Sequence, residues 1–470
     1  MTFFRSALTA PAITLTGAAL LFLLLVPPPA AGREEPAVDY GLVRELMSPE
    51  RKVRRAAART LLRDRHPSLI PVVVDALFFV PAPARDEAIG VLEELTGENR
   101  GRRYLDWVEL VGAREDVAPP AGYREWKRSL LERIDPRFRA MLSDDAAVRL
   151  RLEELVWGGV RVEGIPALER PPKVSAREAR FMRPGDRVFG VSLEGRHHAY
   201  PLKVLGWHEM VNDTLGGRPI TLSYCTLCGS GVLYDTARDG DEPLTFGTSG
   251  LLYRSNKLMI DRQSGSLWSN LTGEAVVGAA AEAAGARLEM LPVTLTTWRR
   301  WLEAHPETTV AEPDPDFGKR FGYDYTEGAA DRRREGVSFP VWQKSDRFDD
   351  KAEVLAIRLD GRSKAYELEA LTAAGLLNDT LGDVPLLVLI AADGGARAYR
   401  RGGAQVFERV GPAALTDREG RRWAVGASAL EPPEGSDLAP LERLPAHVAF
   451  WFGWYGFYPD TEVYPEAAEG

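Results

Sequence analysis

The stretch VFGVSLEGRHHAYPLKVLGWHEMVNDTLGGRPITL (188–222) recurs later in the chain as VLAIRLDGRSKAYELEALTAAGLLNDTLGDVPLLV (354–388). The two stretches align without gaps at an offset of 166, with 14 identities in 35 positions, where chance gives about two. The similarity continues where LPVTLTTWRRWLEAHPETTV (291–310) matches LPAHVAFWFGWYGFYPDTEV (444–463) at an offset of 153. A tandem duplication is the simplest explanation, and it predicts two β-rich halves related by pseudo-twofold symmetry.

The local sequence of the first copy also predicts a β-rich fold. Short runs with many β-branched or aromatic residues, bounded by Gly, Asn and Asp, are typical of strands. Such runs occupy 188–193, 219–224, 231–235 and 251–261. Helical interruptions are expected around 202–211 and 297–304.

The region before the duplicated part has a different pattern. From Tyr40 to about Val156 the apolar residues follow a helical period, and Pro49 and Pro67 lie where helices can start. Short helices separated by such turns resemble a HEAT-like solenoid. We therefore expect an α+β protein with a HEAT-like helical region at 38–156, a first β-rich repeat at 157–346 and a second, degenerate repeat at 347–465.

The N-terminus has the pattern of a secretory signal. One cation, Arg5, precedes an apolar run that ends at Val26, and three prolines and the small residues 30–32 follow. We expect residues 1–32 to be a signal peptide; an uncleaved membrane anchor is the alternative, and would be the only contact with a membrane. Either reading predicts an extracytoplasmic location, periplasmic or secreted.

Composition narrows the range of partners. The 470 residues carry 59 basic and 68 acidic side chains, a net charge of −9. Such a chain has no global positive field to hold a phosphate backbone, so nucleic acid is not expected as a partner. The helical region at 38–156 is where a protein partner could bind.

Comparison of the two copies separates shared residues from special ones. Tyr200 and Asn212 recur as Tyr366 and Asn378, so the common fold explains them. Residues present in the first copy alone are candidates for chemistry. They are His197, His198, His208, Glu209, Cys225, Cys228 and His305, opposite Ser363, Lys364, Ala374, Gly375, Ala391, Gly394 and Tyr458.

Cys225 and Cys228 are the only cysteines, and they form a Cys-x-x-Cys-Gly segment between two expected strands. A thioredoxin-type pair opens a helix, whose N-terminus lowers the thiol pKa, and no helix is expected here. A haem attachment is excluded because Gly229 stands where a His is required. The spacing suits a metal knuckle, a turn-closing disulfide or an active dithiol.

A metal site needs more ligands than the two sulfurs, and His208 is the best further donor because the second copy lacks it. His197, His198 and Met259 are weaker candidates.

The motifs together resemble a prokaryotic family known as domain of unknown function 3179. They are IPALERP (165–171), VFGVSLEG (188–195), AYPLKVLGWHEMVNDTLGGRP (199–219), TLSYCTLCGSGVLYD (221–235), TFGTSGLLYRSNKLMIDRQSGSLW (245–268) and FWFGWYGFYPDTEVY (450–464). The resemblance covers about residues 155–465 and includes the cysteine pair and the His208-Glu209 dipeptide. It implies no activity, because the family is uncharacterised.

Three hypotheses follow for an exported protein. The first is a metal-binding protein that holds zinc or copper through Cys225, Cys228 and His208. The second is a thiol–disulfide oxidoreductase that uses the same cysteines. The third is a scaffold that recruits a partner through its helical region and carries a structural disulfide.

Overall fold

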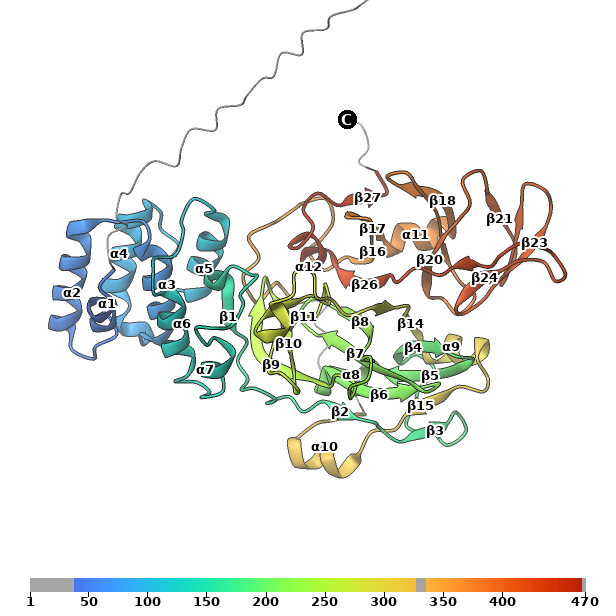
Figure 1. The fold of residues 1–470 in the computed structure, drawn as a ribbon, viewed down its shortest axis with the longest axis horizontal. Helices are drawn as coiled ribbons and strands as arrows, with labels where there is room; N and C mark the ends of the chain where they lie inside the picture. The colour runs from blue at the N-terminus through green and yellow to red at the C-terminus, as the bar shows by residue number, and fades with distance from the viewer. Residues whose placement is uncertain (1–37, 327–334, 467–470) are drawn as a thin grey trace, which may run out of the picture. The chain divides into compact units, whose positions relative to one another are not determined.

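The helices of the N-terminal region lie together beside the first strand of the β-rich part in the computed structural model, which describes residues 38–326 and 335–466 (Figure 1). The fold class is therefore mixed α+β, as predicted, with the helices first and many sheets after them. The helices of this region are α1 Tyr40–Glu45, α2 Arg51–Asp64, α3 Leu69–Phe79, α4 Asp86–Thr96, α5 Tyr104–Ala113, α6 Tyr123–Leu131 and α7 Phe138–Met141.

Helix α3 forms the centre of this region. Its residues from Leu69 to Leu77 are all buried, whereas α2 exposes a row of arginines on its outer face. The buried carboxylate of Asp75 accepts hydrogen bonds from Lys127 Nζ at 2.7 Å and from Tyr123 Oη at 2.7 Å. Asp75, Lys127 and Tyr123 thus partner one another, which offsets the cost of removing them from water.

Residues 155–321 form three five-stranded sheets in the described part of the chain, ordered β1-β9-β10-β11-β12, β13-β8-β7-β6-β2 and β14-β4-β5-β15-β3. Neighbouring strands are antiparallel except in the pairs β2–β6 and β5–β15. The elements are β1 Leu155–Trp157, β2 Leu168–Glu169, β3 Lys173–Ser175, β4 Arg187–Leu193, β5 Arg196–Pro201, α8 Leu202–His208, β6 Met210–Leu215, β7 Arg218–Cys225, β8 Ser230–Asp235, β9 Phe246–Tyr253, β10 Asn256–Asp261, β11 Leu267–Ser269, β12 Ala275–Val277, β13 Met290–Leu291, β14 Thr294–Thr297, α9 Trp298–Ala304, β15 Thr309–Ala311 and α10 Pro315–Phe321.

Residues 353–464 form sheets ordered β26-β16-β17-β27, β18-β19-β20 and β21-β22-β23-β24-β25. Strand β27 runs parallel to β17, as β15 does to β5. The elements are β16 Glu353–Leu359, β17 Arg362–Glu367, α11 Leu368–Ala374, β18 Leu376–Leu381, β19 Val384–Ile390, β20 Ala396–Arg400, β21 Phe407–Gly411, β22 Ala414–Asp417, β23 Arg422–Val425, β24 Ala429–Glu431, β25 Leu441–Glu442, β26 His447–Phe450, α12 Trp451–Tyr455 and β27 Glu462–Tyr464.

Residues shared by the two aligned stretches of sequence make the same hydrogen bonds. Asn212 holds the main chain of Phe246 through both amide atoms, at 2.9 and 2.8 Å, and Asn378 holds Phe407 in the same way at 2.8 and 2.8 Å. The indole of Trp301 donates to Thr308 Oγ1 at 2.9 Å, and that of Trp454 donates to Thr461 Oγ1 at 3.0 Å. These contacts tie strands together in each half, which gives the shared residues a structural role.

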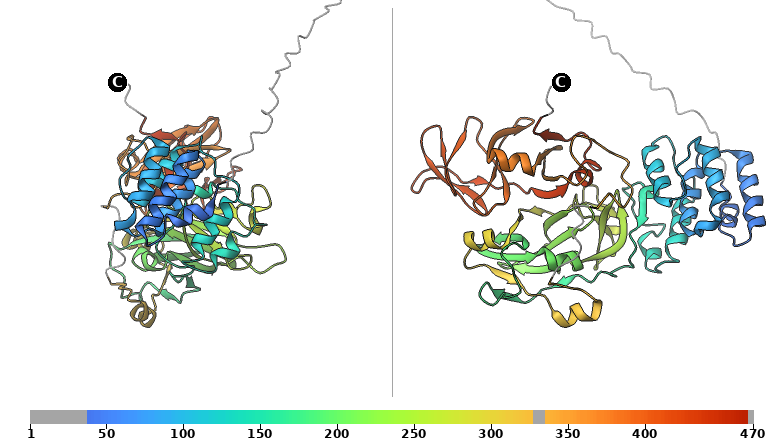
Figure 2. Two further views of the ribbon diagram at one scale, coloured as in Figure 1. Left: turned by 90° about the vertical axis from the view of Figure 1, so that its left-hand side faces the viewer. Right: turned by 180° about the vertical axis from the view of Figure 1, so that it is seen from behind.

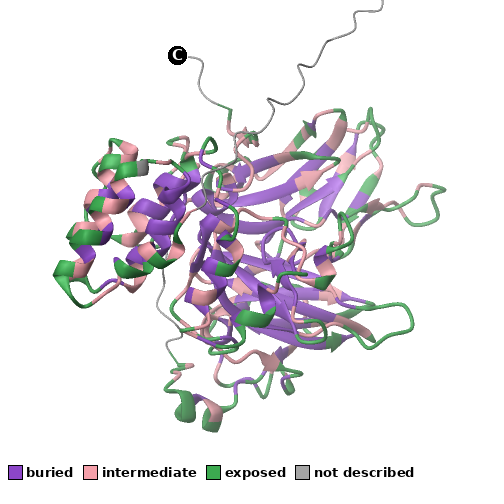
Figure 3. Cartoon of the chain, turned by 60° about the vertical axis from the view of Figure 1, so that its left-hand side comes forward, coloured by how far each residue is buried: buried purple, intermediate pink, exposed green. Residues whose placement is uncertain are grey.

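The helical region and the sheets share one core. Val156 of β1 and Leu252 of β9 belong to the same cluster of buried residues as the helices α1–α6. Figure 2 shows the helices next to this sheet from two further directions, and Figure 3 shows buried residues continuing from the inner helix faces into the strands. The domain boundaries near residues 156 and 346 therefore stay predictions.

The predicted signal peptide or anchor, residues 1–32, lies outside the described residues. Of the helices in the described ranges, none is both long enough and apolar enough to cross a membrane.

The stretch 251–261 differs from the single strand expected of it. Strand β9 ends at Tyr253 and β10 starts at Asn256, so the chain reverses at Arg254 and Ser255. Both turn residues have positive φ, 48° and 61°, which is the geometry of a two-residue hairpin turn. Neither is Gly or Asn, so the turn has no sequence signal of the usual kind.

Acid should destabilise the protein through His447, whose buried ring has no hydrogen-bond partner among the described residues. Burial lowers its pKa to about 4, against about 6.5 in an unfolded chain. The unfolded state therefore binds more protons between these values, and stability is lost as pH falls from 6.5 to 4, by roughly 3 kcal/mol. Urea unfolding at pH 7.5 and 4.5 should show a smaller loss in His447→Leu than in the wild type; equal losses would contradict the assignment.

Candidate functional site

The Cys-x-x-Cys segment is the turn between β7 and β8. Strand β7 ends at Cys225, which faces Ser230, the first residue of β8, across the ladder. Gly229 has a φ of +61°, and a side-chain carbon at this position would lie 2.9 Å from the ring of Phe450. The turn thus requires Gly on both grounds. As predicted, a strand and not a helix follows the pair.

The two cysteines are both present as thiols, and their side chains are in contact. Cys225 is 1% exposed and Cys228 is 0% exposed. Burial raises the pKa of Cys225. Hydrogen bonds from the Cys228 thiol and from the main-chain N–H groups of Cys228 and Lys257 lower it by more, so the net shift is downward. Burial and the neighbouring Cys225 raise the pKa of Cys228 well above its usual range. Cys225 is therefore the more acidic thiol of the pair.

Lys257 reaches the site from β10. Its side chain lines the same cavity as Cys225, and its Nζ donates to the main-chain carbonyl of Glu209 at 2.5 Å. The register between β9 and β10 shifts just beyond it, where residues 249–251 of β9 lie opposite Leu258. Burial lowers the pKa of the Lys257 ammonium, and this outweighs Glu209 and the two cysteines, which raise it.

Glu209 has the opposite electrostatic effect to the hydrogen-bond donors, because its carboxylate raises the pKa of Cys225. It ends helix α8 with a φ of +56°. Its main-chain carbonyl accepts hydrogen bonds from Tyr224 N at 2.8 Å and from Lys257 Nζ at 2.5 Å. Its Oε1 accepts from Thr226 Oγ1 at 2.9 Å.

Cys228 has its own polar neighbours. Asn256 Nδ2 donates to Cys228 Sγ at 2.8 Å, and Cys228 Sγ lies 3.3 Å from Ser230 Oγ. Asn270 Nδ2 donates to the same Ser230 hydroxyl at 3.0 Å. Asn256 and Lys257 are consecutive residues of β10, so this strand contacts the Cys228 sulfur and also lines the cavity beside Cys225.

The second half of the chain covers the pair. Phe450 N donates to Cys228 O at 2.8 Å, and Lys351 Nζ donates to Leu227 O at 3.0 Å. A side-chain carbon at Gly453 would lie 2.6 Å from Cβ of Cys228, so α12 packs directly on this residue. The half without cysteines thereby shields Cys228 from solvent.

Cys225 opens instead onto a cavity of about 200 Å³. Glu209, Thr226 and Lys257 are the chemically active side chains in its wall. The remaining lining comes from Gly158, Val160, Ile165, Leu227, Thr248, Gly250, Leu251, Leu252, Leu258 and Phe339.

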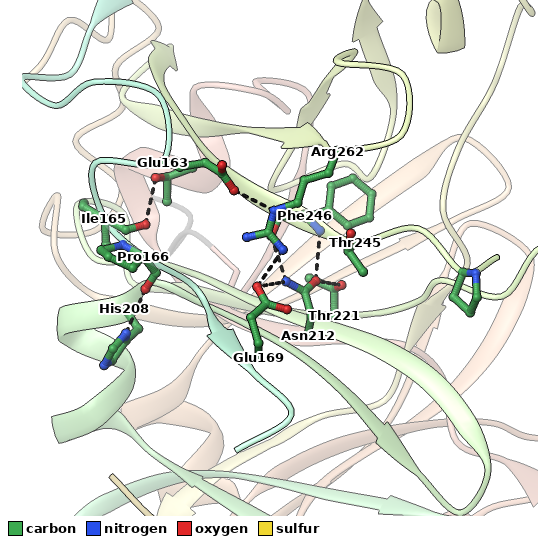
Figure 4. Close-up of polar contacts among 12 residues, drawn as sticks. Glu163, Ile165, Pro166, Glu169, His208, Asn212, Thr221, Thr245, Phe246 and Arg262 are labelled. Carbon is green, nitrogen blue, oxygen red and sulfur yellow. Dashed lines mark hydrogen bonds and ion pairs between the residues drawn. The ribbon is translucent and has the colours of Figure 1, made fainter. Parts of the chain in front are cut away.

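Both ring nitrogens of His208 have partners other than the sulfurs. Its Nδ1 lies 2.8 Å from the carbonyl of Pro166, as Figure 4 shows, and its Nε2 lies 2.5 Å from the hydroxyl of Tyr325. Figure 4 also shows the polar contacts of Asn212 and Arg262, in which Arg262 binds Glu163 and Glu169. In the ranges that the structure describes, no group of three or more His, Cys, Asp or Glu is arranged to hold a metal ion.

The weaker candidates also have partners elsewhere. His197 Nδ1 lies 2.7 Å from Ser192 Oγ, and His198 Nδ1 lies 2.6 Å from Thr309 Oγ1. Met259 is fully buried in an apolar cluster with Val232. The structure therefore brings together Cys225 and Cys228 with Glu209, and leaves the histidines apart from them.

Lys257 and Asn256 are the site residues that sequence reasoning missed. A signal was available, because the span from Phe246 to Asp261 has 16 residues and the matching span from Phe407 to Asp417 has 11. The longer β9–β10 hairpin of the first half carries both residues.

The fold and the site define an α+β protein with a buried cysteine pair beside a cavity. The chain belongs to the family described as Protein of unknown function (DUF3179), whose model matches residues 162–461. No curated protein and no solved structure matches the chain.

The two charges beside Cys225 should shift its reactivity in opposite directions. Lys257→Met removes a cation and should raise the pKa of Cys225, whereas Glu209→Gln removes an anion and should lower it. The pH dependence of iodoacetamide labelling of Cys225, followed by mass spectrometry, measures this pKa, and one unit corresponds to about tenfold in rate below it.

Lys319→Met is the matched control for the lysine change, because the Lys319 side chain is 79% exposed. It should leave the labelling profile as in the wild type. Shifts of the same sign in Lys257→Met and Glu209→Gln would contradict the electrostatic account.

Proposed function

We propose that the protein is a thiol–disulfide oxidoreductase in which Cys225 is the attacking thiolate and Cys228 the resolving thiol. The observation that carries this proposal is that two free thiols share the β7–β8 turn and that Cys225 lines a cavity together with Lys257; a lowered pKa at Cys225 supports it. A thiolate is the nucleophile in disulfide exchange, and a lowered pKa is what makes one available at neutral pH.

The exchange takes two steps. The Cys225 thiolate attacks one sulfur of a disulfide RSSR, which forms the mixed disulfide Cys225–S–S–R and releases RS⁻, and this takes a proton from solvent. Cys228 then attacks Cys225 Sγ, which forms the Cys225–Cys228 disulfide and releases the second RS⁻, and this takes the Cys228 proton. Two thiols are oxidised and one disulfide is reduced to 2 RSH. A dithiol reductant reverses the steps and restores the pair.

Lys257 has a second role in this scheme. Its ammonium lines the cavity with Cys225, so it lies where negative charge appears on the leaving sulfur. Stabilising a charge that develops in the transition state lowers the barrier more than binding the substrate does. High pKa at Cys228 suits the resolving role, because this thiol keeps its proton until the mixed disulfide forms.

Tandem duplication with loss of the site from the second half is the proposed origin of this arrangement. The repeated Asn–Phe and Trp–Thr hydrogen bonds support it, as does the parallel strand that ends each half. The second half has Ala391 and Gly394 in place of the cysteines and a hairpin five residues shorter. Its remaining role is to cover the pair in the first half.

Metal binding is the second candidate, and the contact between two soft sulfurs favours it. Thiolates select Cu(I) and zinc. Both ring nitrogens of His208 have other partners, so a zinc site at the cysteines would need two ligands from elsewhere.

An extracytoplasmic location and a protein partner on a HEAT-like helical region remain part of the proposal. The N-terminal sequence supports the first, and an oxidising compartment is where a disulfide-forming pair is used. A row of short helices supports the second.

Trapping the mixed disulfide tests the oxidoreductase. The Cys228→Ser variant, treated with 2-hydroxyethyl disulfide, should accumulate the adduct at Cys225 because the second step is lost. Cys225→Ser should form no adduct, and the wild type should pass to the internal disulfide, a loss of two hydrogens by mass. An adduct at Cys228 in Cys225→Ser at the wild-type rate would overturn the assignment of roles.

Elemental analysis of protein purified without chelator distinguishes metal binding from the oxidoreductase. The oxidoreductase predicts less than 0.1 equivalent of zinc or copper, by our order-of-magnitude criterion of ~0.1 for adventitious metal. One equivalent that disappears in both Cys→Ser variants, together with failure to form the internal disulfide, would replace the redox proposal with the metal site.

A further inference from the structure

We infer that the substrate of the cysteine pair is a low-molecular-weight disulfide that enters the cavity beside Cys225, and that disulfides of folded proteins are excluded; this inference rests on the proposed oxidoreductase function. Size selection of this kind depends on how the attacking sulfur is reached, and it is independent of how that sulfur is activated.

The first argument is burial. Cys225 is 1% exposed and Cys228 is 0% exposed, so neither sulfur can meet a disulfide held on the surface of another folded protein. Exchange requires the attacking sulfur to approach a disulfide sulfur directly, and access is therefore part of the rate. A protein substrate would have to insert its main chain between the walls of the site.

The second argument is the size of the cavity. About 200 Å³ equals roughly seven water molecules at ~30 Å³ each, and is below the ~300–1,000 Å³ of pockets for drug-sized ligands. A small linear disulfide fits such a space, whereas a protein loop does not.

The third argument is where the walls come from. The mouth is lined by partly exposed side chains, among them Val160, Ile165, Leu227 and Phe339, and the floor by the β9–β10 hairpin. These walls come from separate parts of the chain, from the segment after β1 to the segment that precedes β16. Cys228 is closed off on the other side by Phe450 and Gly453, so the cavity is the route to the pair.

Charge in the cavity also suits a small neutral disulfide. Lys257 Nζ lies 3.8 Å from Glu209 Oε2, so one cation and one anion balance each other. Apart from the Cys225 sulfur itself, the cavity therefore offers no net charge with which to recruit an acidic or a basic protein surface.

The test compares two oxidants on the reduced full-length chain at equal disulfide concentration. One is 2-hydroxyethyl disulfide and the other is insulin, and formation of the Cys225–Cys228 disulfide is followed by thiol quenching and mass spectrometry. We expect at least a 100-fold faster reaction with the small disulfide. Equal rates would overturn the size selection and leave the oxidoreductase intact, whereas no oxidation by either would overturn the oxidoreductase itself.

Two variants at the mouth of the cavity sharpen the test. Val160→Trp should slow oxidation by 2-hydroxyethyl disulfide at least tenfold, and Phe339→Ala should raise the rate with insulin. Oxidation in urea, where the cavity is lost, should be equal in all three proteins, which separates a blocked route from a damaged pair. An unchanged rate in folded Val160→Trp would show that substrate does not pass through this cavity.

Discussion

The hydrogen bond from Asn256 Nδ2 to Cys228 Sγ, 2.8 Å long, is the interaction on which the site depends. It joins the β7–β8 turn, which carries the cysteines, to the β9–β10 hairpin, which carries Asn256 and Lys257. Burial alone would raise the pKa values of both thiols. Polar neighbours outweigh burial for Cys225, whose pKa is lowered, but not for Cys228, whose pKa is raised, so the two thiols differ in acidity.

Thiolate stabilisation here uses no helix. In many dithiol proteins a helix N-terminus supplies partial positive charge to the first cysteine. In this chain β8 follows the pair, and the positive groups are two main-chain N–H groups and the Lys257 ammonium. Main-chain N–H groups of a turn and of a strand thus take the place of a helix N-terminus.

Sequence reasoning could predict the α+β class, most strand positions and the contact between Cys225 and Cys228, because strand periodicity and three-residue spacing are local properties. It placed the candidate site in the stretch with the cysteines by subtracting the residues that this stretch shares with 354–388, and that placement stays a prediction. It missed Lys257 and Asn256, because the turn at Arg254 and Ser255 has no glycine or asparagine to mark it. It predicted His208 as a metal ligand beside the cysteines, and this stays a prediction. It could not predict that the ring contacts Pro166 and Tyr325, partners 42 and 117 residues away. Long-range partners of this kind depend on tertiary packing, which the sequence pattern does not encode.

A redox titration of the cysteine pair tests the central claim most directly. The full-length protein would be equilibrated in buffers of defined ratio of reduced to oxidised dithiothreitol or glutathione, quenched with acid, and its free thiols counted by alkylation and mass spectrometry. The account predicts one reversible two-electron transition of Cys225 and Cys228, with a tenfold change in their ratio per ~30 mV. A pair that stays reduced under every buffer, or a disulfide that no buffer reduces in the folded protein, would contradict it.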